Sequence, residues 1–434
     1  MKYQKELEIK YTPDVLVVGA GPAGVAAAIA AARCGMDVLL TDSQGSFGGA
    51  ATSALVPCFA PFGDGVNVLA AGIGYEIRKE VSRDVPLDAY WTPLKVEELK
   101  RAYDKAICES GVKPLLFTTL CDVVCNDRKV DYAVFSAKSG LFAVKAKIYI
   151  DCTGDGDLCA YAGASYEIGD RYGNVMPATL CSLWANIDYS ARRGSDASRL
   201  EEAFADGVFS VEDRHLPGMQ TVSREEGIGG GNIGHAFGVD PLDEDSLTRA
   251  MITSRKTVTE YDRYYREYLS GFEKLTLVAT GASLGVRESR RILCDYTLCV
   301  DDFLSRAVFE DEIGRYCYPV DIHIMNTDKE EFERFNEEYN KRLRYAKGES
   351  YGIPYRSLIP KGLDNILVAG RCIGSDREMQ ASVRVMPGCF ITGQAAGAAA
   401  SLAVKNHNVR GFDIKELQRK LLELGAFLPN YKEE

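Results

Sequence analysis

Two stretches of the sequence have the G-x-G-x-x-G spacing that brings bare backbone close to a phosphate group, namely GAGPAG at 19–24 and GIGGGNIG at 227–234. Such glycines give a tight turn, a close approach to pyrophosphate and close packing of a helix on a strand. Two sites of this kind would indicate an enzyme that moves hydride from a nicotinamide to a second cofactor. One site would mean that the reducing equivalents come from, or go to, something else. The flanking sequence decides between these alternatives.

The first stretch lies in the context that a dinucleotide site requires. The preceding DVLVV is apolar and β-branched, as in a buried parallel strand. We expect Gly19 to form the turn, Gly21 to admit a pyrophosphate and Gly24 to let a helix pack on the strand. Pro22 suits the helix start, where a missing N–H costs little and the helix dipole favours phosphate. A second strand, DVLLTD, ends at Asp42, whose carboxylate can bind the adenosine ribose hydroxyls.

The second stretch lacks this context. The polar TVSREE precedes it, and Gly238 and Pro241 exclude a long helix after it. We therefore expect 227–234 to be a flexible or substrate-facing loop, and the chain to bind one dinucleotide. His235 follows this loop and is a candidate acid or base, although a lone histidine is more often structural.

Composition narrows the class of protein. The net charge of −11 argues against nucleic acid and anionic membranes as partners. The charged MKYQKELEIK is not a secretory signal, and the uncharged 15–32 stretch contains three glycines and a proline, which fits a strand, turn and helix better than a membrane span. The thirteen cysteines form no C-x-x-C, which predicts reduced thiols in a cytoplasmic protein and no metal site.

Arginines are the main candidates for binding a substrate, because a guanidinium forms bidentate hydrogen bonds with a carboxylate. A group of them in an acidic protein indicates an anionic small molecule. The alternative is a structural role, in which Arg287 and Glu288 form ion pairs with neighbouring residues and so tie two parts of the chain together. Tyr355 is a further candidate, as a proton donor. The arginines are Arg287, Arg290 and Arg291 in GVRESRR, Arg356 in IPYRSLIP, and Arg377 and Arg384 in the segment 364–404.

Several motifs together resemble the FAD-dependent oxidoreductases of the glutathione-reductase-like superfamily. More narrowly, the chain resembles the group related to the flavin domain of heterodisulfide reductase, with fumarate reductase flavoproteins as more distant relatives. The motifs span residues 14–404 and are GAGPAG, GGAAT, DCTGDGDL, GVRESRR, IPYRSLIP, LVAGRCI and SVRVMPGCFITGQAAG. Two features depart from the family pattern. The cluster-binding cysteines of heterodisulfide reductase are not visible, and Arg377 stands where the family often has a histidine.

The resemblance implies that FAD is the cofactor. The candidate residues for its adenosine, pyrophosphate and ribityl parts are Gly19, Gly21, Pro22, Ala23, Gly24, Asp42, Ser43, Gly48, Gly49, Ala50, Cys121, Thr153, Gly154 and Asp157. Those for the ribityl chain and isoalloxazine ring are Gly370, Arg371, Met386 and Gly388. A small-residue helix begins near Pro387, and its N-terminus carries about half a positive charge, which would favour the negatively charged reduced flavin by about 1–2 kcal/mol.

The expected fold is α/β: a glutathione-reductase-like, Rossmann-type FAD-binding domain with a parallel sheet and a β-meander, formed by 1–165 and 356–434. An α+β cap domain, 166–355, is inserted, and the two would form a ligand cleft. We expect hydride exchange between flavin N5 and a small, carboxylate-bearing substrate. The alternative is a flavoprotein subunit that passes electrons to a protein partner, and an oligomer is compatible with either. The candidate catalytic residues are Arg287, Arg356, Arg377, Arg384, Tyr355 and His235.

Overall fold

A computed structural model describes residues 4–82, 85–86, 89–216 and 218–433. Its centre is a five-stranded parallel sheet in the order β19-β10-β2-β3-β6. The predicted strands at 14–18 and 37–42 are confirmed. In this spatial order the strands are Ile366–Val368, Ile148–Asp151, Val15–Val18, Val38–Thr41 and Lys113–Leu115.

Both faces of this sheet are buried, which explains why its strands are continuously apolar rather than alternating. Val15 and Val17 of β2 belong to one core cluster, and Leu16 and Val18 belong to another. The first cluster includes helices α1 (Pro22–Arg33) and α10 (Met386–Ala403). The second includes strands of the antiparallel sheet on the opposite face.

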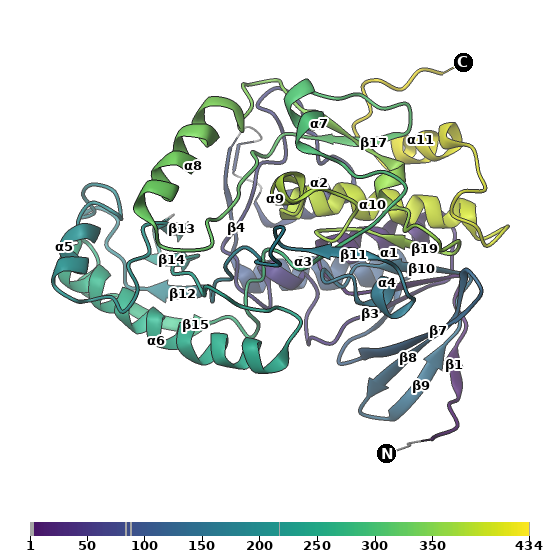
Figure 1. The fold of residues 1–434 in the computed structure, drawn as a ribbon, viewed down its shortest axis with the longest axis horizontal. Coiled ribbons are helices and arrows are strands. Elements are labelled where there is room, and N and C mark those ends of the chain that lie inside the picture. The colour runs from purple at the N-terminus through teal and green to yellow at the C-terminus, as the bar shows by residue number, and fades with distance from the viewer. Residues whose placement is uncertain (1–3, 83–84, 87–88, 217, 434) are drawn as a thin grey trace.

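Helices α1 and α10 pack closely because both are rich in small residues (Figure 1). A Cβ added to Gly393 would lie 2.1 Å from the Ala23 carbonyl oxygen, and one added to Gly397 would lie 2.1 Å from the Ala27 carbonyl oxygen. The predicted C-terminal small-residue helix is confirmed. It begins at Met386, so Pro387 lies in its first turn.

The predicted β-meander is also confirmed. Strands β7 (Thr119–Asn126), β8 (Lys129–Ala137) and β9 (Gly140–Val144) are antiparallel neighbours, and β1 (Ile9–Tyr11) adds to β9 in parallel. The strand that follows, β10, leaves the meander and joins the parallel sheet. The turn after β10 leads into the short helix α4 (Asp157–Tyr161).

A second antiparallel sheet lies at one end of the molecule, beside helices α5 and α6 (Figure 1). Its order is β13-β14-β12-β15, and all neighbours are antiparallel. Its core contains Trp184 and three tyrosines of α6. The longest helix beside this sheet is α6. The elements are β13 (Met219–Ser223), β14 (Ile228–Gly231), β12 (Ser182–Ala185), β15 (Thr276–Thr280), α5 (Leu200–Ala205) and α6 (Glu244–Tyr268).

The prediction that 227–234 is a loop is wrong in part, because residues 228–231 form β14 in the middle of this sheet. The glycines allow neighbouring side chains to approach the strand from both faces. A Cβ on Gly230 would lie 2.1 Å from Pro57 Cβ, and one on Gly229 would lie 2.7 Å from Met219 Cγ. The stretch is therefore a closely packed strand and not a second dinucleotide site.

Strands β17 and β18 are antiparallel neighbours joined by the long segment that contains α8, and β17 packs against α10. Their residues Ile313, Tyr316, Tyr351 and Ile353 belong to the same core cluster as α1. The division at 166–355 stays a prediction. None of the helices in the described part of the chain has both the length and the apolar character that a membrane crossing needs. The remaining elements are β4 (Cys58–Phe59), α2 (Ile73–Val81), β5 (Thr92–Pro93), α3 (Val96–Ser110), β11 (Tyr166–Ile168), β16 (Arg290–Ile292), α7 (Val300–Ser305), β17 (Glu312–Tyr316), α8 (Lys329–Arg342), β18 (Tyr351–Pro354), α9 (Arg377–Val383) and α11 (Ile414–Glu423).

Candidate FAD and substrate site

A cavity of about 520 Å³ lies at the carboxyl ends of the parallel strands. Val18, Thr41, Cys152 and Ala369, each at the end of a strand or directly after one, line it. This edge is where open α/β sheets bind ligands, because the strand order there leaves a crevice between neighbouring loops.

The three motif glycines have different surroundings. Gly19 has a φ of +94°, and an added Cβ would lie 2.3 Å from the Cys152 carbonyl oxygen, so this tight turn requires glycine. At Gly24 an added Cβ would lie 1.7 Å from the Gly19 carbonyl oxygen. At Gly21 an added Cβ meets no described atom within 4 Å. Gly21 therefore faces open space at the first turn of α1, where free backbone N–H groups favour an anion.

Asp42 is held rigidly at the end of β3. Its Oδ2 accepts a hydrogen bond from the Ala20 backbone N–H at 2.5 Å, and its Oδ1 accepts one from the Gln44 N–H at 2.8 Å. Burial raises the pKa of this carboxyl above its ordinary value. The side chain also lines the cavity, which places an oriented acceptor where the ribose hydroxyls are expected.

Other polar groups along the cavity still have capacity to bind a ligand. Arg371 donates to Asp155 Oδ1 at 2.7 Å, and its Nε is buried without a hydrogen-bond partner among the described residues. The same is true of Arg384 Nε. Met386 lines the cavity where α10 begins, so the positive end of the α10 dipole lies at the cavity wall. The open space at Gly21 and these orphaned donors fit an elongated, anionic cofactor such as FAD.

Most of the predicted cofactor residues line the cavity together. They are Gly19, Gly21, Pro22, Ala23, Asp42, Ser43, Gly49, Ala50, Thr153, Gly154, Asp157, Gly370, Arg371 and Met386.

Four predicted residues do not line the cavity. Gly24 and Gly388 are packing positions, because a Cβ at either would lie within 2.4 Å of a backbone oxygen. Gly48 supports the turn and donates its N–H to the Ala20 carbonyl at 2.8 Å. Cys121 is exposed on β7, beside the lining residues 118–120.

Other lining residues had not been predicted from the sequence. Leu247 and Met251 stand one turn apart on α6 and give the cavity an apolar wall. Their i, i+4 spacing in the sequence was the available signal, because it is the spacing of residues on one helix face. Asp155 lies in the same turn as the predicted cofactor residues Gly154 and Asp157. Leu284, Gly285 and Val286 also line the wall, and the last two are the first residues of GVRESRR.

Of the candidate arginines, Arg384 lines the cavity. One of its terminal nitrogens donates to the Asp321 carbonyl oxygen at 3.2 Å and lies 3.7 Å from Asp321 Oδ2. Arg377 is directed to Glu288, with its Nε 3.3 Å from Oε2. Arg291 also pairs with Glu288, at 2.7 Å, which supports the structural alternative for these two arginines.

Arg287 is buried and donates only to uncharged acceptors: the Pro177 carbonyl at 2.7 Å, Thr179 Oγ1 at 2.9 Å and Asn232 Oδ1 at 3.1 Å. Among the described residues no carboxylate lies within ion-pair distance of it. Burial lowers the pKa of this guanidinium to about 10, and the positive charge of Arg384 adds to the effect.

The structure does not bring Arg356 or Tyr355 to the cavity. Arg356 is on the surface and pairs with Asp311 at 3.0 Å. Tyr355 is buried, and its hydroxyl donates to the Val409 carbonyl at 2.8 Å. The ion pair with Asp311 explains the position of Arg356, and packing in the core together with the hydrogen bond to Val409 explains that of Tyr355.

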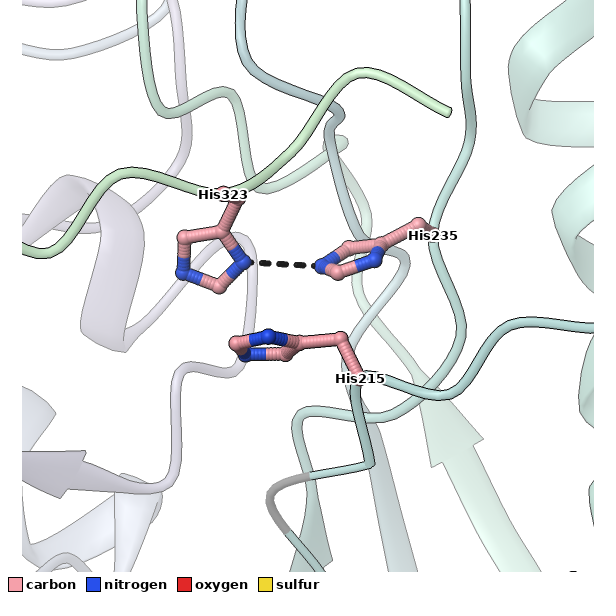
Figure 2. Close-up of side chains that lie close together, drawn as sticks. All are labelled: His215, His235 and His323. Carbon is pink, nitrogen blue, oxygen red and sulfur yellow. Dashed lines mark hydrogen bonds between the residues drawn. The ribbon is translucent and has the colours of Figure 1, made fainter. Parts of the chain in front are cut away.

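His235 is not a lone histidine, because its ring lies against those of His215 and His323 (Figure 2). His235 Nε2 lies 2.9 Å from His323 Nδ1. The three come from separate backbone segments, one between α5 and β13, one after β14 and one between β17 and α8. We call them the three-histidine cluster.

Comparison with known proteins gives a family. No curated protein matches the sequence significantly. Among solved structures, a geranylgeranyl bacteriochlorophyll reductase-like protein from Thermoplasma acidophilum is 14% identical, with 95% of this chain and 83% of that chain covered and a TM-score of 0.48. A p-nitrophenol 4-monooxygenase from Pseudomonas putida is 11% identical, with 95% and 85% covered and a TM-score of 0.46. At these identities and TM-scores, neither carries an argument about activity.

The family model for FAD dependent oxidoreductases matches residues 14–421, which is nearly the whole chain. The match includes the glycine motif, the strand ends that line the cavity and α10. The chain therefore belongs to the family of FAD-dependent oxidoreductases, and it is an enzyme that uses FAD as its cofactor.

Proposed function

We propose that this enzyme exchanges a hydride between flavin N5 and a small organic substrate that carries a carboxylate. The observation that carries the proposal is the lining residue Arg384 together with Arg287, a buried arginine close enough for the two charges to act on each other. Arg384 lines the cavity and has a buried donor without a partner, and Arg287 is a buried cation whose contacts are all uncharged.

Electrostatics explain why this pair favours an anion. A buried cation without a charged partner is costly, and Arg287 and Arg384 also repel each other. Asp213 and Asp321 act on Arg287 only through longer-range attraction. A substrate carboxylate beside Arg384 would stabilise both guanidiniums and accept a bidentate pair of hydrogen bonds.

Each part of the cavity has a role in this proposal. The residues of the glycine motif and Asp42 hold the nucleotide end of FAD. FAD, when bound, supplies a site that accepts or donates a hydride. Leu247 and Met251 form an apolar wall that excludes water, and Arg384 orients the substrate. The N-terminus of α10 contributes a fixed positive potential where Met386 lines the cavity.

A second candidate function is that of a flavoprotein subunit that transfers electrons to a protein partner. It is favoured by strand β15, which is at the edge of its sheet and exposes Leu277 and Val278, with 38% and 56% of their surface accessible. An exposed apolar edge strand is a typical docking surface.

Two narrower proposals rest on the sequence. Within the family, the motifs favour a closer relationship to the flavin domain of heterodisulfide reductase. A cytoplasmic location is supported by the thirteen cysteines, all of which are unpaired thiols.

The proposal is tested by anaerobic mixing of the FAD-loaded enzyme with small mono- and dicarboxylic acids, followed at the flavin absorption band. The matching amides serve as uncharged controls. We expect one or more acids, and none of the amides, to reduce the oxidised flavin or reoxidise the reduced flavin. Bleaching only by a reduced protein would support the second candidate instead.

The arginine assignment has its own test, which uses two identical substitutions. Arg384→Met removes hydrogen bonds to a charged group that are worth about 1.5–3 kcal/mol, so binding of the active acid should weaken about 10–100-fold. Arg356→Met is the control, because Arg356 is on the surface, and it should leave binding unchanged. Equal effects of the two substitutions would refute the role of Arg384.

A further inference from the structure

We propose that His215, His235 and His323 bind one divalent transition-metal ion, through one ring nitrogen each, and leave a coordination position open. One nitrogen of each ring lies within 4.8 Å of the other two. Figure 2 shows the three rings gathered around a common point. Three protein ligands with an open position for water or an oxygen anion are typical of catalytic metal sites.

The distances are close to those that a metal ion requires. With metal–nitrogen bonds of about 2.0–2.1 Å, tetrahedral ligands stand roughly 3.3–3.4 Å apart. His235 Nε2 and His323 Nδ1 are 2.9 Å apart, so they need to separate by only a few tenths of an ångström. The ring of His215 lies 4.4 Å from that of His323 and 5.1 Å from that of His235, centre to centre. Small rotations of the side chains would bring the nitrogens into place.

Carboxylates stand behind two of the rings. His235 Nδ1 lies 3.1 Å from Asp213 Oδ2, and His323 Nε2 lies 3.5 Å from Asp321 Oδ2. A carboxylate behind a metal-binding imidazole fixes its tautomer and raises the basicity of the nitrogen that faces the metal. His235 Nδ1 has no hydrogen-bond partner of good geometry among the described residues, so a small turn of the ring or of Asp213 would complete this arrangement.

A metal ion would select the tautomers in which both rings turn their N–H groups toward these carboxylates. If each ring donates its N–H to its own carboxylate, then His235 Nε2 and His323 Nδ1 both face inward as unprotonated acceptors. Two lone pairs 2.9 Å apart repel each other unless a proton or a metal ion lies between them. A metal ion would satisfy both nitrogens, and also the ring of His215, without breaking either contact with a carboxylate.

A proton is the weaker competitor near neutral pH. Burial lowers the pKa of all three imidazoles, and that of His215 falls to about 4. Neutral imidazole is the form that binds metals.

The donor set selects the class of metal. Three imidazoles without a thiolate suit Zn²⁺, Fe²⁺, Ni²⁺ or Cu²⁺ and do not suit Mg²⁺ or Ca²⁺, which prefer oxygen ligands. The site is separate from the FAD cradle, although Asp321 links its neighbourhood to Arg384.

The test uses the full-length, FAD-loaded enzyme after treatment with a chelator. Titration with Co²⁺ should give visible absorption bands beyond the flavin spectrum that saturate at one ion per chain. Zn²⁺ should displace Co²⁺ and remove these bands. X-ray absorption of the zinc-loaded protein should show three nitrogen neighbours. These measurements use the unaltered chain, so they do not depend on the folding of any variant.

Matched variants locate the ion. His235→Asn keeps an amide N–H near the position of Nδ1, facing Asp213, and deletes the inward Nε2, so binding of one ion per chain should be lost. His407→Asn is the control, because His407 is the fourth histidine, is exposed, and has a φ of +50° that asparagine tolerates. Asp213→Asn should weaken Zn²⁺ binding about 10–100-fold.

Two results would overturn the proposal. One is that the unaltered enzyme binds neither Co²⁺ nor Zn²⁺ at one per chain. The other is that His235→Asn, with unchanged near-ultraviolet circular dichroism and unchanged flavin content, binds the ion as tightly as His407→Asn does. In either case the three histidines would be a hydrogen-bonded network only.

Discussion

Gly21→Ala and Gly24→Ala should have opposite consequences, although the change is the same and the positions lie within one turn. At Gly21 an added Cβ meets no described atom within 4 Å. At Gly24 it would lie 1.7 Å from the Gly19 carbonyl oxygen and 2.8 Å from the carbonyl carbon. The first change should therefore affect the bound cofactor, and the second should affect the fold.

The magnitude for Gly21→Ala follows from its conformation and surroundings. Its φ of −68° and ψ of −174° are ordinary for alanine, so the apoprotein should be as stable as the wild type or about 0.4–1 kcal/mol more stable. The methyl group would occupy space where the pyrophosphate is expected. Loss of one hydrogen bond to a charged group costs about 1.5–3 kcal/mol, which corresponds to an increase in the Kd for FAD of about 10–100-fold.

The magnitude for Gly24→Ala is set by a backbone overlap, which only a shift of α1 away from the turn at Gly19 can relieve. Overpacking of a well-filled interior costs about 1–3 kcal/mol and occasionally more. Alanine regains about 1 kcal/mol as a better helix former. Because the overlap is with backbone atoms, the cost should lie near the upper end of that range, and we expect the apoprotein to lose about 1–2 kcal/mol net.

The assay separates the two effects. Urea unfolding of both apoproteins, followed by circular dichroism, gives the shift in midpoint at constant slope. Titration with FAD, followed by flavin fluorescence, gives the Kd. The reasoning is refuted if Gly21→Ala binds FAD within twofold of the wild type, or if the unfolding midpoint of Gly24→Ala is unchanged.

Three further predictions concern other parts of the molecule. Gly393→Ala should lower the free energy of unfolding by about 1–2 kcal/mol after the gain in helix propensity, because its Cβ would lie 2.1 Å from the Ala23 carbonyl oxygen; an unchanged urea midpoint would contradict this. Burial raises the pKa of Asp376 from 3.8 to about 6, so the folded state binds this proton more tightly. Relative to Asp376→Asn, wild-type stability should therefore fall as the pH rises from about 4 to 6, and parallel pH profiles would exclude this. Zn²⁺ at a hundred times its Kd should stabilise the enzyme by about 2.7 kcal/mol in thermal unfolding, and this gain should be absent in His235→Asn.

The sequence was sufficient to predict the nucleotide-binding unit because its determinants are local. The strand at 14–18, the glycines, the helix and Asp42 form one continuous segment of about thirty residues, and each residue type there has a backbone role that can be derived from sequence alone. The same holds for α10, whose small residues indicate close packing without saying against which element. Of the fourteen predicted cofactor residues that line the cavity, five lie in the segment that ends at Asp42, and the others were implied by the family resemblance; the five are Gly19, Gly21, Pro22, Ala23 and Asp42.

Only the tertiary structure decided how distant segments meet. A glycine-rich stretch became β14 because Pro57 and Met219 pack against its faces, and both lie outside the stretch. The arginines looked equivalent in sequence, yet Arg384 reaches the cavity whereas Arg356 remains on the surface.

The three-histidine cluster makes the same point most clearly. His215, His235 and His323 are twenty and eighty-eight residues apart, so no local spacing marks them as metal ligands. Contacts of that kind depend on how the second sheet and the segment before α8 pack against each other. That packing is set by the whole buried interior, which is why residues that are near in sequence were predictable and residues that are near only in space were not.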